Sequence, residues 1–282
     1  MAHRTGPILT LTEANALRHA QRAGDVSARL SLDLGRGQTD VQLAADHWRW
    51  RELPFPYLDD AKPRTIYYWD GDGFAPLQRF SGALIKLVAT EWGAPTFEID
   101  GIKMLPTAQL SPFVDAERKV QLIKPQGKIV LDCCGGLGYF AACCLAQGAR
   151  QILSFEKNPS VLWLRQHNPW SPDPDAPEHG GRLQLEQGDI SELITALPDQ
   201  SVDAILHDPP RFGIAGELYA LCFYQQLARV IRPGGTLFHY TGMPNLKTSG
   251  RDVPAEVMRR LTQAGFTAER KLDGVLATRR RR

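Results

Sequence analysis

Runs of residues typical of strands alternate with runs typical of helices from about residue 111 to the C-terminus. Strand-like runs include KIVLDC (128–133), QILSFE (151–156), VDAILHD (202–208) and a closing pair, FTAERKL (266–272) and GVLATRR (274–280). Strands that alternate with helices are typical of a parallel sheet that is covered on both faces. The pattern therefore predicts an α/β fold with a seven-stranded, mostly parallel sheet and helices on both faces, closed by an antiparallel pair.

The first 110 residues have a different pattern. Alternating apolar and polar residues flank the turn GRGQ (35–38), and two further hairpins are predicted around the Asp-Gly turns at Asp70 and Asp100. The segment SGALIKLVATEW (81–92) predicts a helix. We therefore expect a smaller, strand-rich α+β domain over residues 1–110, which would help to form or cover the substrate pocket, and a second domain over residues 111–282.

Composition narrows the class of protein without identifying it. The chain has 282 residues, and its net charge of +2 gives no broad basic field for nucleic acid or a membrane. We find neither a secretory leader nor an apolar run long enough to span a membrane, which predicts a cytoplasmic protein without a membrane partner. The five cysteines lack CxxC spacing, so we expect buried thiols and no metal site. The sequence leaves open whether the chain forms a homodimer.

Glycines are concentrated directly after the first strand of the predicted sheet. The stretch DCCGGLG (132–138) ends that strand with Asp132 and places Gly135, Gly136 and Gly138 before the next helix. Glycine lets the backbone approach a ligand closely and leaves the amides at the helix N-terminus accessible. Tight packing of a strand against a helix favours glycine too, so this turn gains meaning only from the neighbouring strand ends.

Acidic residues follow the next three strands. Glu156 ends the second strand at about the 20-residue offset at which an acid meets ribose hydroxyls in nucleotide-binding folds. The third strand leads to Asp189, and the fourth runs into HDPPRF (207–212). Acids at strand ends can cap the following helix. Because ligands bind outside the carboxyl ends of strands in open α/β sheets, the four ends together predict a crevice that seats a nucleoside cofactor.

This set of strand ends resembles the class I S-adenosylmethionine-dependent methyltransferases, and the resemblance covers about residues 111–282. The family's first motif is present as DCCGGLG, with Cys134 where the first glycine usually stands. The resemblance implies a Rossmann-like fold and S-adenosylmethionine as cofactor. By resemblance, the cofactor-binding residues are Asp132, Gly135, Gly136 and Gly138 around the methionine portion, Glu156 and Asn158 at the ribose, and Asp189 and Ile190 at the adenine.

The motif HDPPRF resembles the Asp/Asn-Pro-Pro-aromatic motif with which amino-group methyltransferases hold a planar amine. Here Arg211 displaces the aromatic residue to Phe212. HDPPRFGIAGELY (207–219) also resembles a group of predicted prokaryotic methyltransferases. The resemblance implies that Asp208 orients the methyl acceptor, nitrogen being favoured over carbon, with His207 and Tyr240 as candidates for proton removal or substrate contact. The acceptor, a small molecule or a nucleic acid, is left undetermined.

A second enzyme class is the aminopropyltransferases of the spermidine synthase type, which use decarboxylated S-adenosylmethionine. FEIDGIKM (97–104) ahead of the glycine turn loosely resembles their sequence, and HDPP lies near the place of their catalytic acid. Their glycine turn carries an Asp where this chain has Leu137. This difference favours methyl transfer over aminopropyl transfer.

A dinucleotide-binding protein is a third alternative, because GLGYFA (136–141) fits the G-x-G-x-x-G/A pattern and Glu156 suits its ribose acid. That interpretation leaves Asp132 and the Asp-Pro-Pro unexplained.

A nucleic-acid-binding module is the last alternative. The stretch DHWRWRELPF (46–55) interleaves aromatic residues with arginines as a stacking platform would, and KTSGR (247–251) and the C-terminal arginines are basic. The near-zero net charge argues against a broad electrostatic footprint for this class.

Overall fold

The computed structural model describes residues 6–242 and 252–281, and its contacts divide the chain into two compact units. The N-terminal unit consists of residues 1–114 together with 163–171, and the C-terminal unit of residues 115–162 and 172–282. The expected boundary at 110/111 lies just before the first of these divisions. The sequence did not indicate that residues 163–171 belong with the N-terminal unit.

The N-terminal unit is rich in short antiparallel strands. Its elements are β1 (Ile8–Leu9), α1 (Leu11–Ala23), β2 (Ser27–Leu30), β3 (Thr39–Leu43), β4 (His47–Trp50), β5 (Leu53–Pro56), β6 (Tyr67–Trp69), β7 (Phe74–Pro76), β8 (Gln78–Phe80), β9 (Leu84–Val88), β10 (Thr96–Ile99) and β11 (Ile102–Lys103). In the described residues they form three sheets, ordered β1-β6-β7, β2-β3-β4-β5 and β11-β10-β9-β8. The three expected hairpins, β2–β3, β6–β7 and β10–β11, are confirmed.

The expected helix over residues 81–92 is wrong, because this segment contains β9, which pairs with β8 and β10. Pairing in the sheet buries Ile85 and Leu87, which alternate along the strand, and this tertiary burial outweighs local helix propensity. The helix of this unit is instead α1. The Thr10 hydroxyl accepts from the amide of Thr12, and Glu13 completes a capping box. Gly24, with φ of 80°, ends the helix.

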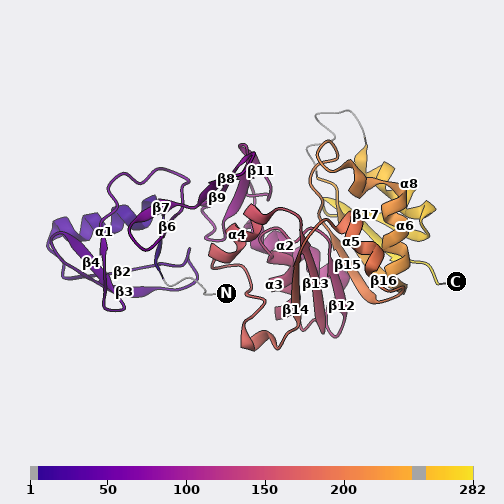
Figure 1. Ribbon diagram of the computed structural model, residues 1–282, viewed down its shortest axis with the longest axis horizontal. Helices are drawn as coiled ribbons and strands as arrows, with labels where there is room; N and C mark the ends of the chain where they lie inside the picture. Colours follow the sequence, from indigo (N-terminus) through magenta and orange to yellow (C-terminus); the bar gives the residue numbers. More distant parts are fainter. Residues whose placement is uncertain (1–5, 243–251, 282) are drawn as a thin grey trace. The chain divides into compact units, whose positions relative to one another are not determined.

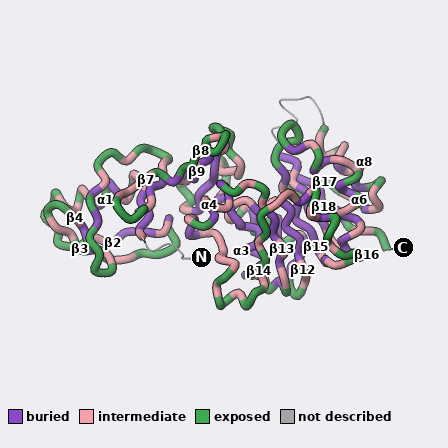
Figure 2. Tube along the Cα trace, viewed as in Figure 1, coloured by how far each residue is buried: buried purple, intermediate pink, exposed green. Residues whose placement is uncertain are grey.

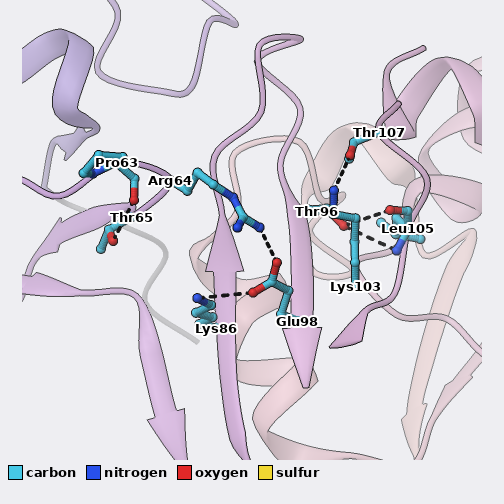
Figure 3. A network of polar contacts seen from close by, with 9 residues as sticks. All are labelled: Pro63, Arg64, Thr65, Lys86, Thr96, Glu98, Lys103, Leu105 and Thr107. Carbon is cyan, nitrogen blue, oxygen red and sulfur yellow. Dashed lines mark hydrogen bonds and ion pairs between the residues drawn. The ribbon is translucent and has the colours of Figure 1, made fainter. Parts of the chain in front are cut away.

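A buried carboxylate links the strands of the β8–β11 sheet. Glu98 on β10 has a side chain that is 6% exposed, and it forms ion pairs with Arg64 and with Lys86 on β9 (Figure 3). Burial would raise the pKa of Glu98, but hydrogen bonds from Lys86 and Arg64 outweigh it and lower this pKa. Glu98 is therefore a charged, structural carboxylate.

The aromatic residues of DHWRWRELPF belong to the core of the N-terminal unit. Trp48 is fully buried, and its ring centroid lies 4.9 Å from that of Phe55, which is 2% exposed. Val41 and Leu17 pack in the same cluster. These two aromatic rings are therefore not exposed for stacking on bases, which removes one observation in favour of the nucleic-acid-binding module.

The C-terminal unit contains the predicted seven-stranded sheet, in the order β14-β13-β12-β15-β16-β18-β17 (Figure 1). The strands are β12 (Ile129–Asp132), β13 (Gln151–Glu156), β14 (Leu183–Gln187), β15 (Val202–His207), β16 (Ile231–Tyr240), β17 (Phe266–Lys271) and β18 (Gly274–Arg279). The first five are parallel, and β18 pairs antiparallel with both β16 and β17. The predicted fold class, a Rossmann-like, mostly parallel sheet with a smaller α+β part, is confirmed.

Helices cover both faces of this sheet. They are α2 (Pro112–Ile123), α3 (Tyr139–Ala146), α5 (Ile190–Leu193), α6 (Leu221–Val230) and α8 (Val253–Gln263), with short 3₁₀ turns η1 (Pro177–His179), η2 (Ile194–Ala196) and η3 (Gly216–Tyr219). A further helix, α4 (Pro159–His167), begins in the C-terminal unit and ends in the N-terminal unit. Leu131, Ile205 and Leu237 share one buried cluster with residues of α5, α6 and α8. Side chains alternate along a strand, so Val130 faces the other side, where α3 contacts β12 and β13. Figure 2 shows the central strands β12 and β15 as largely buried.

Residues 216–231 do not form one continuous helix. The structure has η3, then α6, and β16 already begins at Ile231. A register shift between β15 and β16 accommodates the extra residues, and Gly234 with φ of 81° lies within it. The long strand β16 therefore begins directly where α6 ends.

Candidate functional site

Two neighbouring strands, β12 and β15, flank the topological switch point of the large sheet. From β12 the chain continues to β13 on one side, and after β14 it crosses to β15 on the other side of β12. Asp132, at the end of β12, is paired in register with Ser154 on β13 and Leu206 on β15. Such a switch point is where ligands bind in open α/β sheets, and the residues predicted from the four strand ends lie around it.

The glycine turn and Glu156 form one hydrogen-bonded structure. Oε2 of Glu156 accepts from the amide of Gly136 at 2.9 Å, and Oε1 accepts from the amide of Asn158 at 2.8 Å. Gly136 and Gly138 have φ of 49° and 80°, in the left-handed region that glycine adopts most readily. The amide of Gly135 donates to the carbonyl of Phe155 at 2.7 Å, which holds the turn against β13. The carboxylate therefore orders the turn that leads into α3.

Asp132 is buried beneath this turn. It is 1% exposed, and the Ser154 hydroxyl donates to its Oδ2 at 2.8 Å. A buried carboxylate needs such partners, because desolvation disfavours its charged form. Asp132 is thus a buried acid at the end of β12, held by Ser154 of the neighbouring strand β13.

Asp189 acts as a helix cap in this structure. Its Oδ1 accepts from the amide and the hydroxyl of Ser191 at 2.9 and 2.7 Å, and its Oδ2 pairs with Lys157 at 2.7 Å. Burial would raise the pKa of Asp189, but the hydrogen bonds from Lys157 and Ser191 outweigh it and lower this pKa. Lys157 is largely exposed and is therefore the partner that a ligand could replace. The side chain of Ile190 is buried in the sheet core.

Asp208, directly after β15, belongs to a group of charged and polar residues that we call the Lys119 cluster: Lys119, Asp115, Asp208, Asp273 and Tyr240. Lys119 on α2 is 1% exposed, and its Nζ lies 2.6 Å from Oδ2 of Asp115 and 3.4 Å from Oδ2 of Asp273. The same Nζ lies 4.1 Å from the ring centroid of Tyr240. The cluster joins α2, the ends of β15 and β16, and the turn between β17 and β18.

The electrostatics of the cluster follow from this arrangement. Burial raises the pKa of Asp208 to about 7; the Lys119 ammonium lowers this pKa, whereas the carboxylates of Asp115 and Asp273 raise it. Burial would lower the pKa of Lys119, but the nearby carboxylates outweigh it and raise this pKa, so the ammonium stays charged. Burial and the Asp208 charge raise the pKa of Tyr240, so its phenol stays protonated at neutral pH.

His207 and His239 lie behind the cluster in the sheet core. Both are fully buried, and their ring centroids are 4.5 Å apart. Nε2 of His207 lies 3.0 Å from the carbonyl of Leu218, and burial lowers the pKa of His207 to about 4. The Tyr224 hydroxyl lies 2.8 Å from Nε2 of His239, whose Nδ1 is 2.7 Å from the Tyr240 carbonyl. Both rings are therefore neutral at pH 7, and they connect β15 to η3 and β16 to α6.

Lys119, Asp115 and Asp273 are site residues that sequence reasoning missed. Asp115 and Lys119 are four residues apart in a helix, a common surface pair, and nothing in the sequence indicates that this pair is buried. Asp273 lies in the turn between two strands, where aspartate is ordinary. Only the sheet order, which inserts β18 beside β16, brings this turn to Lys119.

The C-terminal arginines bind main-chain carbonyls. Arg279 donates to the carbonyls of Ala228 and Gly265, and Arg280 to those of Phe266 and Thr262. They therefore complement the C-terminal ends of α6 and α8. The basic stretch 247–251 lies outside the described residues.

No cluster of His, Cys, Asp or Glu among residues 6–242 and 252–281 is arranged to hold a metal ion. In the same part of the chain, no helix combines the length and the apolar character that crossing a bilayer requires.

Comparison of the structure with solved structures finds proteins of similar fold. It resembles spermidine synthase in complex with the transition-state analogue AdoDATO, with a TM-score of 0.55 and 15% identity, over 74% of this chain and 76% of that one. A second similar structure is an S-adenosylmethionine-dependent methyltransferase from Mesorhizobium loti, with a TM-score of 0.42 and 17% identity, over 58% of this chain and 96% of that one. At these identities the likeness concerns the fold alone.

Sequence comparison gives the family. The chain is 40% identical over 266 residues to the uncharacterized protein MJ1233 of Methanocaldococcus jannaschii, and the match covers 89% of each chain. The protein therefore belongs to the family of MJ1233. No family model matches the sequence.

Proposed function

We propose that the protein is an S-adenosylmethionine-dependent methyltransferase that transfers a methyl group to an acceptor nitrogen held at Asp208. The observation that carries this proposal is the convergence of three groups at adjacent strand ends: the glycine turn after β12, Glu156 at the end of β13 and Asp208 after β15. A nucleoside site beside an acceptor-orienting carboxylate is the arrangement that such a transfer requires.

The residues around the crevice fit the cofactor. Glu156, whose carboxylate accepts from the amides of Gly136 and Asn158, lies at the strand end where an acid meets ribose hydroxyls in nucleotide-binding folds. Asp132 supplies negative charge near the expected place of the amino group of the methionine portion. Asp189 and the Ile190 amide would meet the adenine once Lys157 moves aside.

The chemistry that the chain must supply is modest. When bound, S-adenosylmethionine supplies a methyl group on a sulfonium, which accepts the electrons of the broken C–S bond and leaves as a neutral thioether. Asp208 holds the acceptor nitrogen so that its lone pair can form the new C–N bond, and Asp208 accepts the proton that this nitrogen loses. A pKa of about 7 suits this role, because the carboxylate is a base matched to neutral pH.

The charge of the Lys119 cluster bears on the acceptor. Three carboxylates, those of Asp115, Asp208 and Asp273, share the single buried ammonium of Lys119. This surplus of negative charge favours an amine over a phosphate group beside Asp208. It supports nitrogen as the acceptor atom, in a small molecule or in the base of a nucleic acid.

Calorimetric binding tests the proposal. We expect the purified protein to bind S-adenosylmethionine and its demethylated product more tightly than decarboxylated S-adenosylmethionine. Glu156→Ala should weaken this binding by about 1–3 kcal/mol, because charge-assisted hydrogen bonds are lost. Glu186→Ala, which removes an exposed carboxylate on β14, is the matched control and should bind normally. If no S-adenosyl compound binds, the proposal fails.

Aminopropyl transfer is a second candidate, favoured by one observation. The likeness in fold to spermidine synthase covers 74% of the chain, a larger share than the C-terminal unit makes up. Against it, Leu137 stands in the glycine turn where those enzymes have an acid, and Leu137 is 1% exposed. Preference for decarboxylated S-adenosylmethionine in the same calorimetric series would decide for this candidate.

A further inference from the structure

The Lys119 cluster raises the question of why an ammonium is buried beside the proposed acceptor site. Lys119 is 1% exposed, and burying a lysine side chain is costly unless its charge is compensated. Asp115 alone, four residues earlier on α2, would neutralise it. Yet Asp273 lies at 3.4 Å and the Tyr240 ring at 4.1 Å from the same Nζ. His207 and His239 are paired in register on the parallel strands β15 and β16, so Asp208 and Tyr240, the residues that come next, lie at the same end of neighbouring strands, and the Asp208 charge acts on this Nζ. A pair that served only α2 would not need these groups.

We propose that Lys119 is a positioning residue for the reaction at Asp208: its buried ammonium keeps the Asp208 side chain in the carboxylate form that receives the acceptor's proton. This inference rests on the proposed function only for the identity of the reaction. The electrostatic relation between Lys119 and Asp208 is a property of the chain itself and can be measured without cofactor or acceptor.

The surroundings of Asp208 explain why a cation is needed there. Several titratable groups interact electrostatically with the Asp208 carboxyl. They are Lys119 and Asp115 on α2, Asp132 and Cys134 at the end of β12, Tyr219 on η3, Tyr240 on β16, and Asp273 in the β17–β18 turn. Among these described groups, Lys119 is the one cation. Three carboxylates oppose ionisation of Asp208, so removal of Lys119 leaves it with negative neighbours alone.

Lys119 and Asp115 should therefore act on Asp208 in opposite directions. Removal of the ammonium, in Lys119→Met, should raise the pKa of Asp208 by about 1–2 units, the usual effect of an adjacent opposite charge. Removal of the Asp115 carboxylate, in Asp115→Asn, should lower this pKa. Lys119→Arg keeps the positive charge, so the pKa of Asp208 in this variant should stay near its wild-type value. A purely structural role predicts no such opposition.

The test is a carbon-13 NMR titration of protein labelled at the aspartate carboxyl carbons. The Asp208 signal is assigned by its absence in Asp208→Asn, and its titration midpoint is compared between wild type, Lys119→Met, Lys119→Arg and Asp115→Asn. Lys271→Met, which removes an exposed lysine at the end of β17, is the matched control and should leave the midpoint in place. Circular dichroism identifies the variants that fold.

Opposite shifts in Lys119→Met and Asp115→Asn would support the proposal. Unchanged midpoints, or shifts in one direction, would overturn it. If Lys119→Met does not fold, the comparison of Asp115→Asn with wild type decides, and a midpoint that fails to fall refutes the proposal. Binding of S-adenosylmethionine to the wild type is measured separately, so failure of the proposed function is distinguishable. With an acceptor in hand, turnover of Lys119→Met at pH 7 should fall roughly tenfold and recover at higher pH.

Discussion

Replacement of Asp208 by asparagine should stabilise the folded protein, and increasingly so as the pH rises. The pKa of this carboxyl is raised from 3.8 to about 7 in the folded chain, mainly by burial. Folding therefore favours its protonated form. Below the pKa of the unfolded chain, Asp208 is protonated in both the folded and the unfolded state, and it does not lower the free energy of unfolding. As the pH rises from the unfolded to the folded pKa, Asp208 lowers the free energy of unfolding increasingly, and above the folded pKa this loss is constant. Asparagine resembles the protonated form at every pH.

The magnitude follows from the size of the shift. A difference of about 3 pKa units at 1.36 kcal/mol each sets a ceiling of about 4 kcal/mol on the cost above pH 7. Asp208 is only half-buried, and residual contact with water reduces this ceiling. We expect the stability advantage of Asp208→Asn over wild type to grow by about 1–3 kcal/mol between pH 5 and pH 8.

Urea unfolding followed by circular dichroism measures this difference at a series of pH values. Glu269→Gln, which neutralises an exposed carboxylate on β17, serves as the control and should give a difference that is flat with pH. The difference in free energy of unfolding between Asp208→Asn and wild type should increase with pH. If it stays constant or decreases as the pH rises, folding does not raise the pKa of Asp208 and the reasoning is refuted.

Three further substitutions test other parts of the structure by the same unfolding measurement. Tyr224→Phe removes the hydroxyl 2.8 Å from Nε2 of His239 and should destabilise the protein by about 1–3 kcal/mol, because a buried polar atom loses its partner; no loss would mean that water replaces it. Gly138→Ala places a side chain at φ of 80° and should cost about 1–2 kcal/mol, whereas an unchanged stability would show that the turn relaxes. Glu98→Gln should cost about 1–2 kcal/mol at pH 7. Because folding lowers the pKa of Glu98, its carboxylate contributes to the free energy of unfolding above the unfolded pKa, and this contribution is lost as the pH falls through the folded pKa. A loss of stability in Glu98→Gln that becomes larger at acidic pH would contradict this.

The C-terminal unit was predictable because its signals are local and periodic. The parallel strands β12, β13, β14 and β15 lead into a glycine turn or an acid, so the strand ends carrying Glu156, Asp189 and Asp208 could be recognised from sequence. The β9 segment could not, because a short apolar run fits a helix as well as a strand until its partners are known. The Lys119 cluster was missed for a related reason. Its members lie far apart along the chain, and a lysine in a helix is ordinarily exposed.

The route of the chain limits how the protein can be divided. Residues 163–171 belong to the N-terminal unit, where the ring of Trp163 meets Tyr68 and the guanidinium of Arg79, and Trp170 packs on Phe113. A fragment ending near residue 114 would therefore lose part of its own core and expose these aromatic surfaces. The N-terminal unit is compact, but it is not one continuous stretch of chain that could be moved into another protein as a single piece. Exchange of the N-terminal unit between relatives would need two coordinated replacements, one of residues 1–114 and one of residues 163–171.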